Sequence, residues 1–202
     1  MAWAVRQADL RWLGRGDSSL FLLQKRLPAT AILNMAGYMN DVLWHYAPWE
    51  YLGEIITSGC LKVSNAGASR ERPLLWFSTN QHWEPTATKF LRTAEGLVKL
   101  TFDEQAAYYG CIRFGLMDPD TRLLHWRDAC RAAGTPRQLR RKLERAGTEL
   151  GANPSHWFAV ATNVPLGDLL FQVWLGEMGW RNANAAEMAS IWAEHRIGAQ
   201  CP

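Results

Sequence analysis

The sequence predicts an α+β fold, a sheet with flanking helices, for most of its length. Short aromatic and β-branched runs bounded by turn residues predict strands, and segments with apolar residues every three or four positions predict helices. The two kinds of segment follow one another in an irregular order, unlike the regular alternation of a doubly wound parallel sheet. A chain of 202 residues with 48% hydrophobic residues suits one substantial core better than two.

The first forty residues differ from the rest of the chain. Their apolar residues fall in short groups broken by glycine and proline, without a sustained period. Asp9 and Asp17 interrupt the basic character that a transit peptide requires. We therefore expect residues 1–40 to form a loosely attached N-terminal arm and residues 41–202 to form a single α+β domain.

The domain opens with a strand, a helix and two further strands. The aromatic run Val42–Tyr46 predicts the first strand, and Pro48 suits the first turn of a helix whose apolar residues recur at helical spacing. Gly59 is expected to end this helix as a C′ residue. Short strands are then expected at Leu61–Val63 and Leu74–Ser78.

The remaining elements follow from the same patterns. Further strands are expected at Gly96–Phe102, Gly110–Gly115, Trp157–Thr162 and Leu170–Leu175. Helices are expected at Asp120–Ala133, which acidic residues begin and Gly134 ends, at Pro136–Leu150 with Thr135 as its N-cap, and at the C-terminal segment Ala185–His195.

Composition excludes several classes of protein. The four cysteines are far apart, form no CxxC pair and follow no secretory signal, which indicates a reducing cytoplasmic location. No apolar run approaches the roughly 18 residues of a membrane span, so we expect no membrane partner. The five histidines never fall at metal-ligand spacing with one another or with a cysteine pair, so we expect no metal site. The net charge of +3 does not by itself indicate a nucleic-acid-binding protein.

Two further features of the composition leave alternatives open. Eleven tryptophans cannot all be fully buried, so some should line a cleft or an interface. The basic stretch RQLRRKLERAG, residues 137–147, lies on a predicted helix. Its cations are either a solvated helix surface or contacts for the phosphates of a nucleotide or nucleic acid.

Common enzyme motifs are missing from the sequence. It contains no GxSxG, Walker, HExxH or GxGxxG motif. The segment LLWFSTNQHWE, residues 74–84, is different in character, because a buried strand ends on Ser78 and Thr79 and leads directly to Trp83 and Glu84. A pocket for a nucleotide is one explanation of this pattern; a polar strand end beside a tryptophan that covers the core is the other.

Three segments in order resemble the amino-terminal half of ADP-ribosyltransferase-like domains, in the branch of poly(ADP-ribose) polymerases and RNA 2′-phosphotransferases. They are a strand ending on His45-Tyr46, the helix PWEYLGEIITSGCL, and the aromatic strand LLWFSTNQHWE. The resemblance covers mainly residues 42–90. It implies an ADP-ribosyltransferase-like split sheet with flanking helices, and NAD as a substrate.

The resemblance also implies roles for individual residues. His45 would hydrogen-bond a ribose hydroxyl of NAD, and Tyr46 would present its backbone to the nicotinamide amide. Trp83 would stack on the nicotinamide ring, since an indole offers a large π-face. The aromatic strand would contribute cofactor-binding residues at Trp76, Ser78 and Thr79.

The catalytic carboxylate of the resemblance has no direct counterpart. Transferases of this branch often carry a glutamate at the start of a late strand, but the corresponding entrance, Asn153–His156, holds no carboxylate. Either Glu84 supplies this function together with His45, or the chemistry proceeds without it, or the pocket binds without turnover. Glu84 is otherwise a surface carboxylate that caps a helix beginning near Thr86.

Three classes of function therefore stay open. The first is an NAD-dependent ADP-ribosyl transferase-like protein, acting on a protein or nucleic-acid acceptor that the sequence does not identify. The second is a catalytically silent domain that binds a nucleotide or an ADP-ribosylated partner. The third is a protein-binding domain that uses a tryptophan-rich surface.

Overall fold

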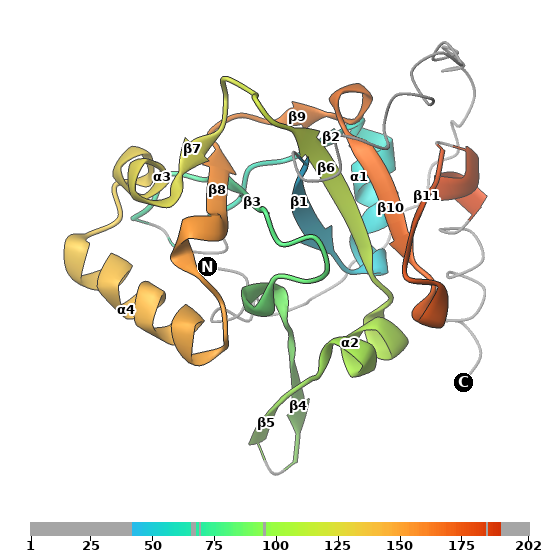
Figure 1. Cartoon of the computed structure of the whole chain (residues 1–202), viewed down its shortest axis with the longest axis horizontal. Coiled ribbons are helices and arrows are strands. Elements are labelled where there is room, and N and C mark those ends of the chain that lie inside the picture. The colour runs from blue at the N-terminus through green and yellow to red at the C-terminus, as the bar shows by residue number, and fades with distance from the viewer. Residues whose placement is uncertain (1–41, 66–67, 69, 95, 185, 191–202) are drawn as a thin grey trace.

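The computed structural model describes residues 42–65, 68, 70–94, 96–184 and 186–190. A seven-stranded sheet with the order β11-β10-β6-β1-β3-β8-β7 forms its centre, and every neighbouring pair in it is antiparallel. Helices flank this sheet (Figure 1), so the coarse prediction of a mixed fold of helices and a sheet is confirmed. The expected N-terminal arm, residues 1–40, lies outside the described residues.

The elements have the following bounds. The strands of the large sheet are β1 Val42–Ala47, β3 Leu75–Ser78, β6 Ile112–Met117, β7 Leu124–His125, β8 Trp157–Val160, β10 Leu170–Trp174 and β11 Trp180–Asn182. Two small sheets pair β2 Cys60–Leu61 with β9 Val164–Pro165, and β4 Phe90–Thr93 with β5 Gly96–Lys99. The α-helices are α1 Leu52–Ser58, α2 Phe102–Tyr109, α3 Trp126–Ala133 and α4 Arg137–Glu149. The 3₁₀ turns are η3 Trp49–Tyr51, η4 Pro85–Ala87, η5 Pro154–His156, η6 Leu166–Asp168 and η7 Gly176–Met178.

Strand β1 divides its side chains between two faces, because successive residues of a strand point in opposite directions. Leu43 and Ala47 belong to the main core, which also holds Leu52 of α1. Trp44 and Tyr46 belong to a separate cluster on the other face. The first predicted helix is confirmed in α1, which Gly59 ends at a φ of 66°.

Strands β1 and β3 meet over a much shorter length than β1 and β6 do. Six residue pairs join β1 to β6, whereas β1 and β3 register at one pair, Trp44 opposite Ser78. Farther along, the imidazole Nδ1 of His45 lies 2.9 Å from the main-chain oxygen of Trp76 in β3. A side chain therefore contacts a β3 carbonyl beyond the single registered pair.

The predicted strand Gly96–Phe102 is wrong at its end. Only Gly96–Lys99 is extended, as the second strand of the β4–β5 hairpin, which projects from the body (Figure 1). Phe102 instead begins α2, because Thr101 and Glu104 form a reciprocal capping box. The first strand of the hairpin and all of α2 were missed, since α2 has little apolar periodicity.

The predicted helix Asp120–Ala133 begins six residues too early. Asp120 forms an ion pair of 2.7 Å with Arg122 in a turn, and the next segment pairs with β8 as the edge strand β7. Helix α3 therefore starts at Trp126. Thr135 is not the N-cap of α4, because its N–H donates to the Cys130 carbonyl and Pro136 occupies the cap position.

Smaller differences concern strand ends. The strand expected at Leu61–Val63 is Cys60–Leu61, and the strand expected at Trp157–Thr162 ends at Val160. The edge strand β11 was not predicted. Of the C-terminal helix expected at Ala185–His195, residues 186–190 are helical and the rest lies outside the described residues.

Substitution of Gly115 in β6 should destabilise the fold. A Cβ atom at this position would lie 2.6 Å from both the Trp44 ring and the Val42 side chain, so the packing on this face must shift. We expect Gly115→Ala to lower the free energy of unfolding by about 1–3 kcal/mol in urea denaturation. Gly167→Ala is the matched control, because a Cβ there meets nothing within 4 Å. Equal stability of the two variants would contradict the tight packing of Trp44.

Candidate functional site

A pocket lies on the face of the sheet opposite α1, above the ends of β1, β3 and β8. The enclosed space is about 20 Å³, room for about one water molecule, and the surrounding empty volume of about 320 Å³ includes open solvent. Its polar side chains are Ser78, Glu84 and Thr86. The remaining lining is apolar and consists of Trp44, Tyr46, Trp76, Phe77, Ala87, Trp126 and Trp157. Four indoles therefore surround a small group of polar atoms.

Glu84 lies among these indoles and is only 5% exposed. One carboxylate oxygen accepts from the Ser78 hydroxyl at 2.7 Å and from the Asn80 amide at 2.6 Å. The other accepts from the Thr86 hydroxyl at 2.8 Å, the Thr86 N–H at 3.3 Å and the Trp157 indole at 3.0 Å. No ion pair joins Glu84 to a cation among the described residues.

The sequence left two interpretations of Glu84, a pocket residue or a surface carboxylate that caps a helix, and the structure agrees with part of each. Glu84 does cap a turn, η4, through the Thr86 N–H, as the structural interpretation expected. Its carboxylate is buried, however, so the expectation that it lies on the surface is wrong. Five donors, and no cationic partner among the described residues, hold the Glu84 carboxylate in place at the base of the pocket.

The segment that carries Glu84 to this position is a loop without regular structure, residues 79–84, here called the bridging loop. The Tyr46 hydroxyl donates to the Asn80 carbonyl at 2.6 Å, and the Trp44 indole donates to the Gln81 side chain at 2.9 Å. The Trp180 indole donates to the His82 carbonyl at 2.8 Å. The bridging loop is thereby tied to β1 and to the distant edge strand β11.

Beside the pocket, a cluster of rings packs over the same face of the sheet. Trp83 lies 4.8 Å from Tyr46 and 4.6 Å from Phe102, measured between ring centroids. The Trp83 indole N–H donates to the Thr88 hydroxyl at 3.1 Å. The cluster continues through His82, Trp174 and Trp180. Trp83 therefore packs between core aromatics and does not belong to the pocket lining.

Arg113 of β6 is a buried cation under this ring cluster. Its guanidinium carbon lies 3.9 Å from the Trp44 ring centroid and 4.2 Å from that of Trp180. It donates to the Gln172 side chain, at 2.7 Å from Nε, and to the Gln81 carbonyl. Burial lowers the pKa of Arg113 to about 10, so it stays charged at neutral pH. Neutral oxygens and π-faces stabilise this charge in place of a carboxylate.

His45 lies on the other face of the sheet, on the same side of β1 as Leu43 and Ala47. Its ring packs 5.9 Å from that of Phe77, and its Nδ1–H donates to the Trp76 carbonyl. Burial lowers the pKa of His45 from the usual 6.5 to about 4. The imidazole is therefore neutral at physiological pH and contacts the backbone of β3.

The titration of His45 predicts a loss of stability in acid. Because the folded-state pKa is lower than the unfolded value, the unfolded chain binds the proton more tightly, and stability falls as the pH drops from about 6.5 to about 4. We expect this residue to remove about 2–3 kcal/mol of unfolding free energy over that range. His45→Asn keeps an N–H near the Nδ1 position without titrating, so its denaturation curves should lose this pH dependence. An unchanged pH dependence would contradict the prediction.

The structure places four of the expected site residues in one pocket. Tyr46, Trp76, Ser78 and Glu84 line it together. His45, Thr79 and Trp83 do not: His45 faces the main core, Thr79 contacts the His156 carbonyl through its N–H, and Trp83 joins the ring cluster.

Sequence reasoning missed several residues of this site. Trp126 and Trp157 form a wall of the pocket, with ring centroids 5.0 Å apart. Asn80 links Glu84 to His156, whose Nδ1 lies 3.1 Å from the Asn80 side-chain oxygen. No local motif identifies them, because they come together from α3, η5, β8 and the bridging loop.

The described ranges hold neither a metal-binding group nor a membrane-spanning helix. No group of three or more His, Cys, Asp or Glu side chains is placed to hold a metal ion in this part of the chain. No helix among the residues described has the length and apolar character to cross a membrane. No family model, no curated protein and no solved structure matches this chain.

Proposed function

We propose that the pocket, once its lining side chains move apart, binds the nicotinamide end of NAD⁺ and that the protein is an ADP-ribosyl transferase-like enzyme with a split sheet of that kind. The observation that carries the proposal is the Glu84 carboxylate, which is buried among four indoles and has no cationic partner among the described residues. The nicotinamide ring of NAD⁺ is planar and positively charged. Indole π-faces and a fixed carboxylate both favour such a ring.

The same arrangement suits the bond cleavage that the proposal requires. When the bond between the ribose C1′ and the nicotinamide nitrogen breaks, its electron pair neutralises the leaving ring and the positive charge moves to the ribose. A carboxylate already held by five donors needs no reorganisation to stabilise that charge. The acceptor then bonds to C1′ and releases a proton.

The proposed role of His45 changes with its position. A ribose contact through its Nδ1 would compete with the bond to the Trp76 carbonyl. In our proposal His45 is a positioning residue, which holds the Trp76 backbone of β3 beside β1. Trp76 itself is half-buried and supplies an indole face to the ligand.

A domain that binds a cationic ring without turnover is the second candidate. The observation that favours it is the complete engagement of Glu84, since five donors leave little capacity to accept a proton from an acceptor group. A tryptophan-rich protein-binding surface has less support. The large hydrophobic side chains exposed in the described part of the chain are Tyr51, Leu97, Val98, Tyr108 and Met178, and none is a tryptophan.

Calorimetric binding tests the charge of the ligand directly. We expect NAD⁺ to bind about tenfold more tightly than NADH, whose ring is neutral, and 1-methylnicotinamide to bind more tightly than nicotinamide. Trp76→Ala should weaken NAD⁺ binding, whereas Tyr108→Ala, an exposed aromatic of α2, is the matched control. Equal affinity for NAD⁺ and ADP-ribose would place the ring outside the pocket. Nicotinamide release measured by chromatography separates the enzyme from the binding domain.

A further inference from the structure

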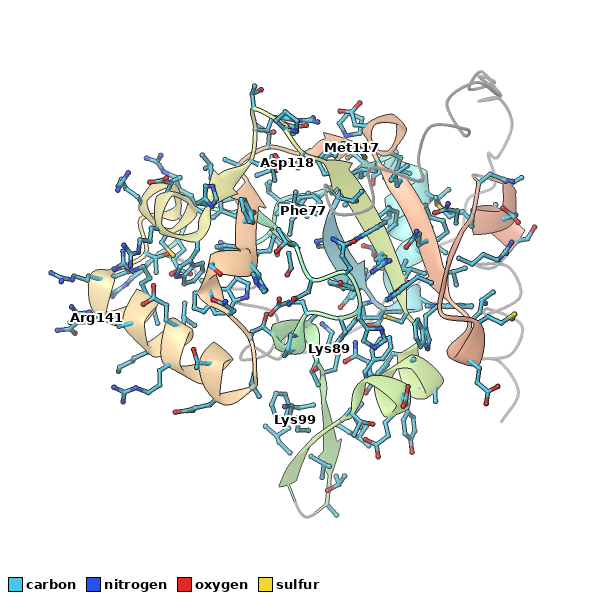
Figure 2. The ribbon with its side chains drawn as sticks, viewed as in Figure 1. Phe77, Lys89, Lys99, Met117, Asp118 and Arg141 are labelled. Atoms are coloured by element: carbon cyan, nitrogen blue, oxygen red, sulfur yellow. The ribbon has the colours of Figure 1, made fainter. Side chains whose placement is uncertain are left out.

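Helix α4 presents an exposed row of cations to solvent. Its 13 residues include five cationic and two acidic side chains, so this one helix carries a net charge of +3, equal to that of the whole chain. Arg137, Arg141 and Arg145 follow one another at four-residue spacing and are all exposed, as is Lys142. Figure 2 shows Arg141 extending away from the body of the protein. We call Arg137, Arg141, Lys142 and Arg145 the α4 basic face.

Some arginines of the described residues have carboxylate partners, and others, such as the buried Arg113, have none. Arg122, Arg131, Arg140 and Arg181 each form an ion pair with an aspartate or a glutamate. No ion pair among the described residues includes a member of the α4 basic face. Like charges four residues apart on a helix repel one another, which makes a bound anion favourable here.

The helix is attached to the wall of the pocket. Glu144 of α4 accepts a hydrogen bond of 2.7 Å from the indole of Trp126, which lines the pocket. Arg140 lies 3.3 Å from the same carboxylate. One side of α4 is therefore tied to a wall of the pocket, and the α4 basic face lies on the solvent side of the same helix.

We propose that the α4 basic face binds the phosphodiester backbone of single-stranded nucleic acid. Guanidinium groups match phosphate oxygens in charge and in geometry, and successive arginines of the row are separated by a rise of about 6 Å along the helix. The exposed side chains of α4 include no large apolar residue, so this surface lacks the anchors that a protein interface or an amphipathic membrane helix uses. A single row of cations follows one strand of phosphates.

Fluorescence anisotropy with a labelled oligonucleotide of about a dozen residues tests the proposal without NAD. The double variant Arg141→Gln/Arg145→Gln should bind single-stranded DNA or RNA about tenfold more weakly than the unmodified protein. Its plot of log affinity against log salt should also be shallower by about 1.4, since each lost phosphate contact contributes about 0.7. Lys62→Gln/Lys99→Gln removes the same charge from exposed positions elsewhere and should bind normally.

Three results would overturn the proposal: no binding at low salt, equal losses in the two double variants, or tighter binding of duplex than of single strands. The measurement is separate from the proposed function. If the protein binds the oligonucleotide but releases no nicotinamide, the proposal for the α4 basic face is supported and the transferase proposal fails. If the protein releases nicotinamide but does not bind the oligonucleotide, the transferase proposal is supported and the proposal for the α4 basic face fails.

Discussion

Replacing Glu84 by alanine is expected to lower the free energy of unfolding by about 3–5 kcal/mol, because a buried polar network then loses its common acceptor. The Trp157 indole, the Ser78 hydroxyl, the Asn80 amide and both donors of Thr86 would remain without their partner. Water that enters from the mouth of the pocket can accept hydrogen bonds from some of these donors. The expected loss of unfolding free energy is therefore smaller than the sum of five separate hydrogen-bond losses. Urea denaturation followed by tryptophan fluorescence measures the change.

Two further variants provide a comparison for the loss of unfolding free energy in Glu84→Ala. Glu84→Gln keeps the shape of the side chain but directs an amide NH₂ toward groups that are themselves donors, so an intermediate loss is expected. Ser78→Ala removes one donor and leaves the carboxylate with four, at about 1 kcal/mol. The expected order of destabilisation is Glu84→Ala, then Glu84→Gln, then Ser78→Ala. A Glu84→Ala protein within 1 kcal/mol of the unmodified chain would contradict the network.

The Glu84→Gln variant also tests the proposed function. Below its melting transition, the folded variant should retain binding of ADP-ribose and lose nicotinamide release by about a hundredfold or more, because the fixed charge is gone. Release at an unchanged rate would remove Glu84 from the chemistry while leaving its structural role intact.

Substitution of Arg113 by methionine should have the second largest effect on stability, about 2–4 kcal/mol. Methionine fills the space between the two indoles but leaves the Gln172 side chain and the Gln81 carbonyl without their donor. The cation–π contacts to Trp44 and Trp180 are also lost. The expected readout is a lower free energy of unfolding together with a changed near-ultraviolet circular dichroism of the tryptophans.

Arg113→Lys is the control for charge. It keeps a cation between the indoles but cannot donate in the planar arrangement of guanidinium, so part of the loss should persist. The opposite result is informative as well. If Arg113→Met is as stable as the unmodified protein, the cost of burying the cation exceeds what its neutral partners contribute.

Elements with a strong period were predictable from the sequence, and elements that depend on pairing were not. The apolar spacing of α1 and α4, with glycine at the end of α1, identified both helices. The edge strand β11 is three residues long and exists because it pairs with β10, which the local sequence does not encode. Helix α2 could have been predicted from its capping box, Thr101 with Glu104, but its aromatic first residue resembled part of a strand.

Some residues of the candidate site could likewise be predicted from the local sequence, and others could not. Tyr46, Ser78 and Glu84 belong to two nearby segments, and their order along the chain was sufficient to group them. His45 was grouped with them wrongly, although the two-residue period of a strand already places it on the face opposite Tyr46. Trp157 approaches Glu84 only because β8 lies beside β3, and that is a property of the whole sheet.

The ties of the bridging loop have a consequence for the thermodynamics of ligand binding. Residues 79–84 have no regular structure, yet bonds from Tyr46, Trp44 and Trp180 fix their carbonyl and side-chain groups. Such a segment loses its conformational entropy when the protein folds and has little left to lose when a ligand arrives. The loop that carries Glu84 is thus preorganised, and binding of the proposed ligand would not have to supply free energy to order this loop.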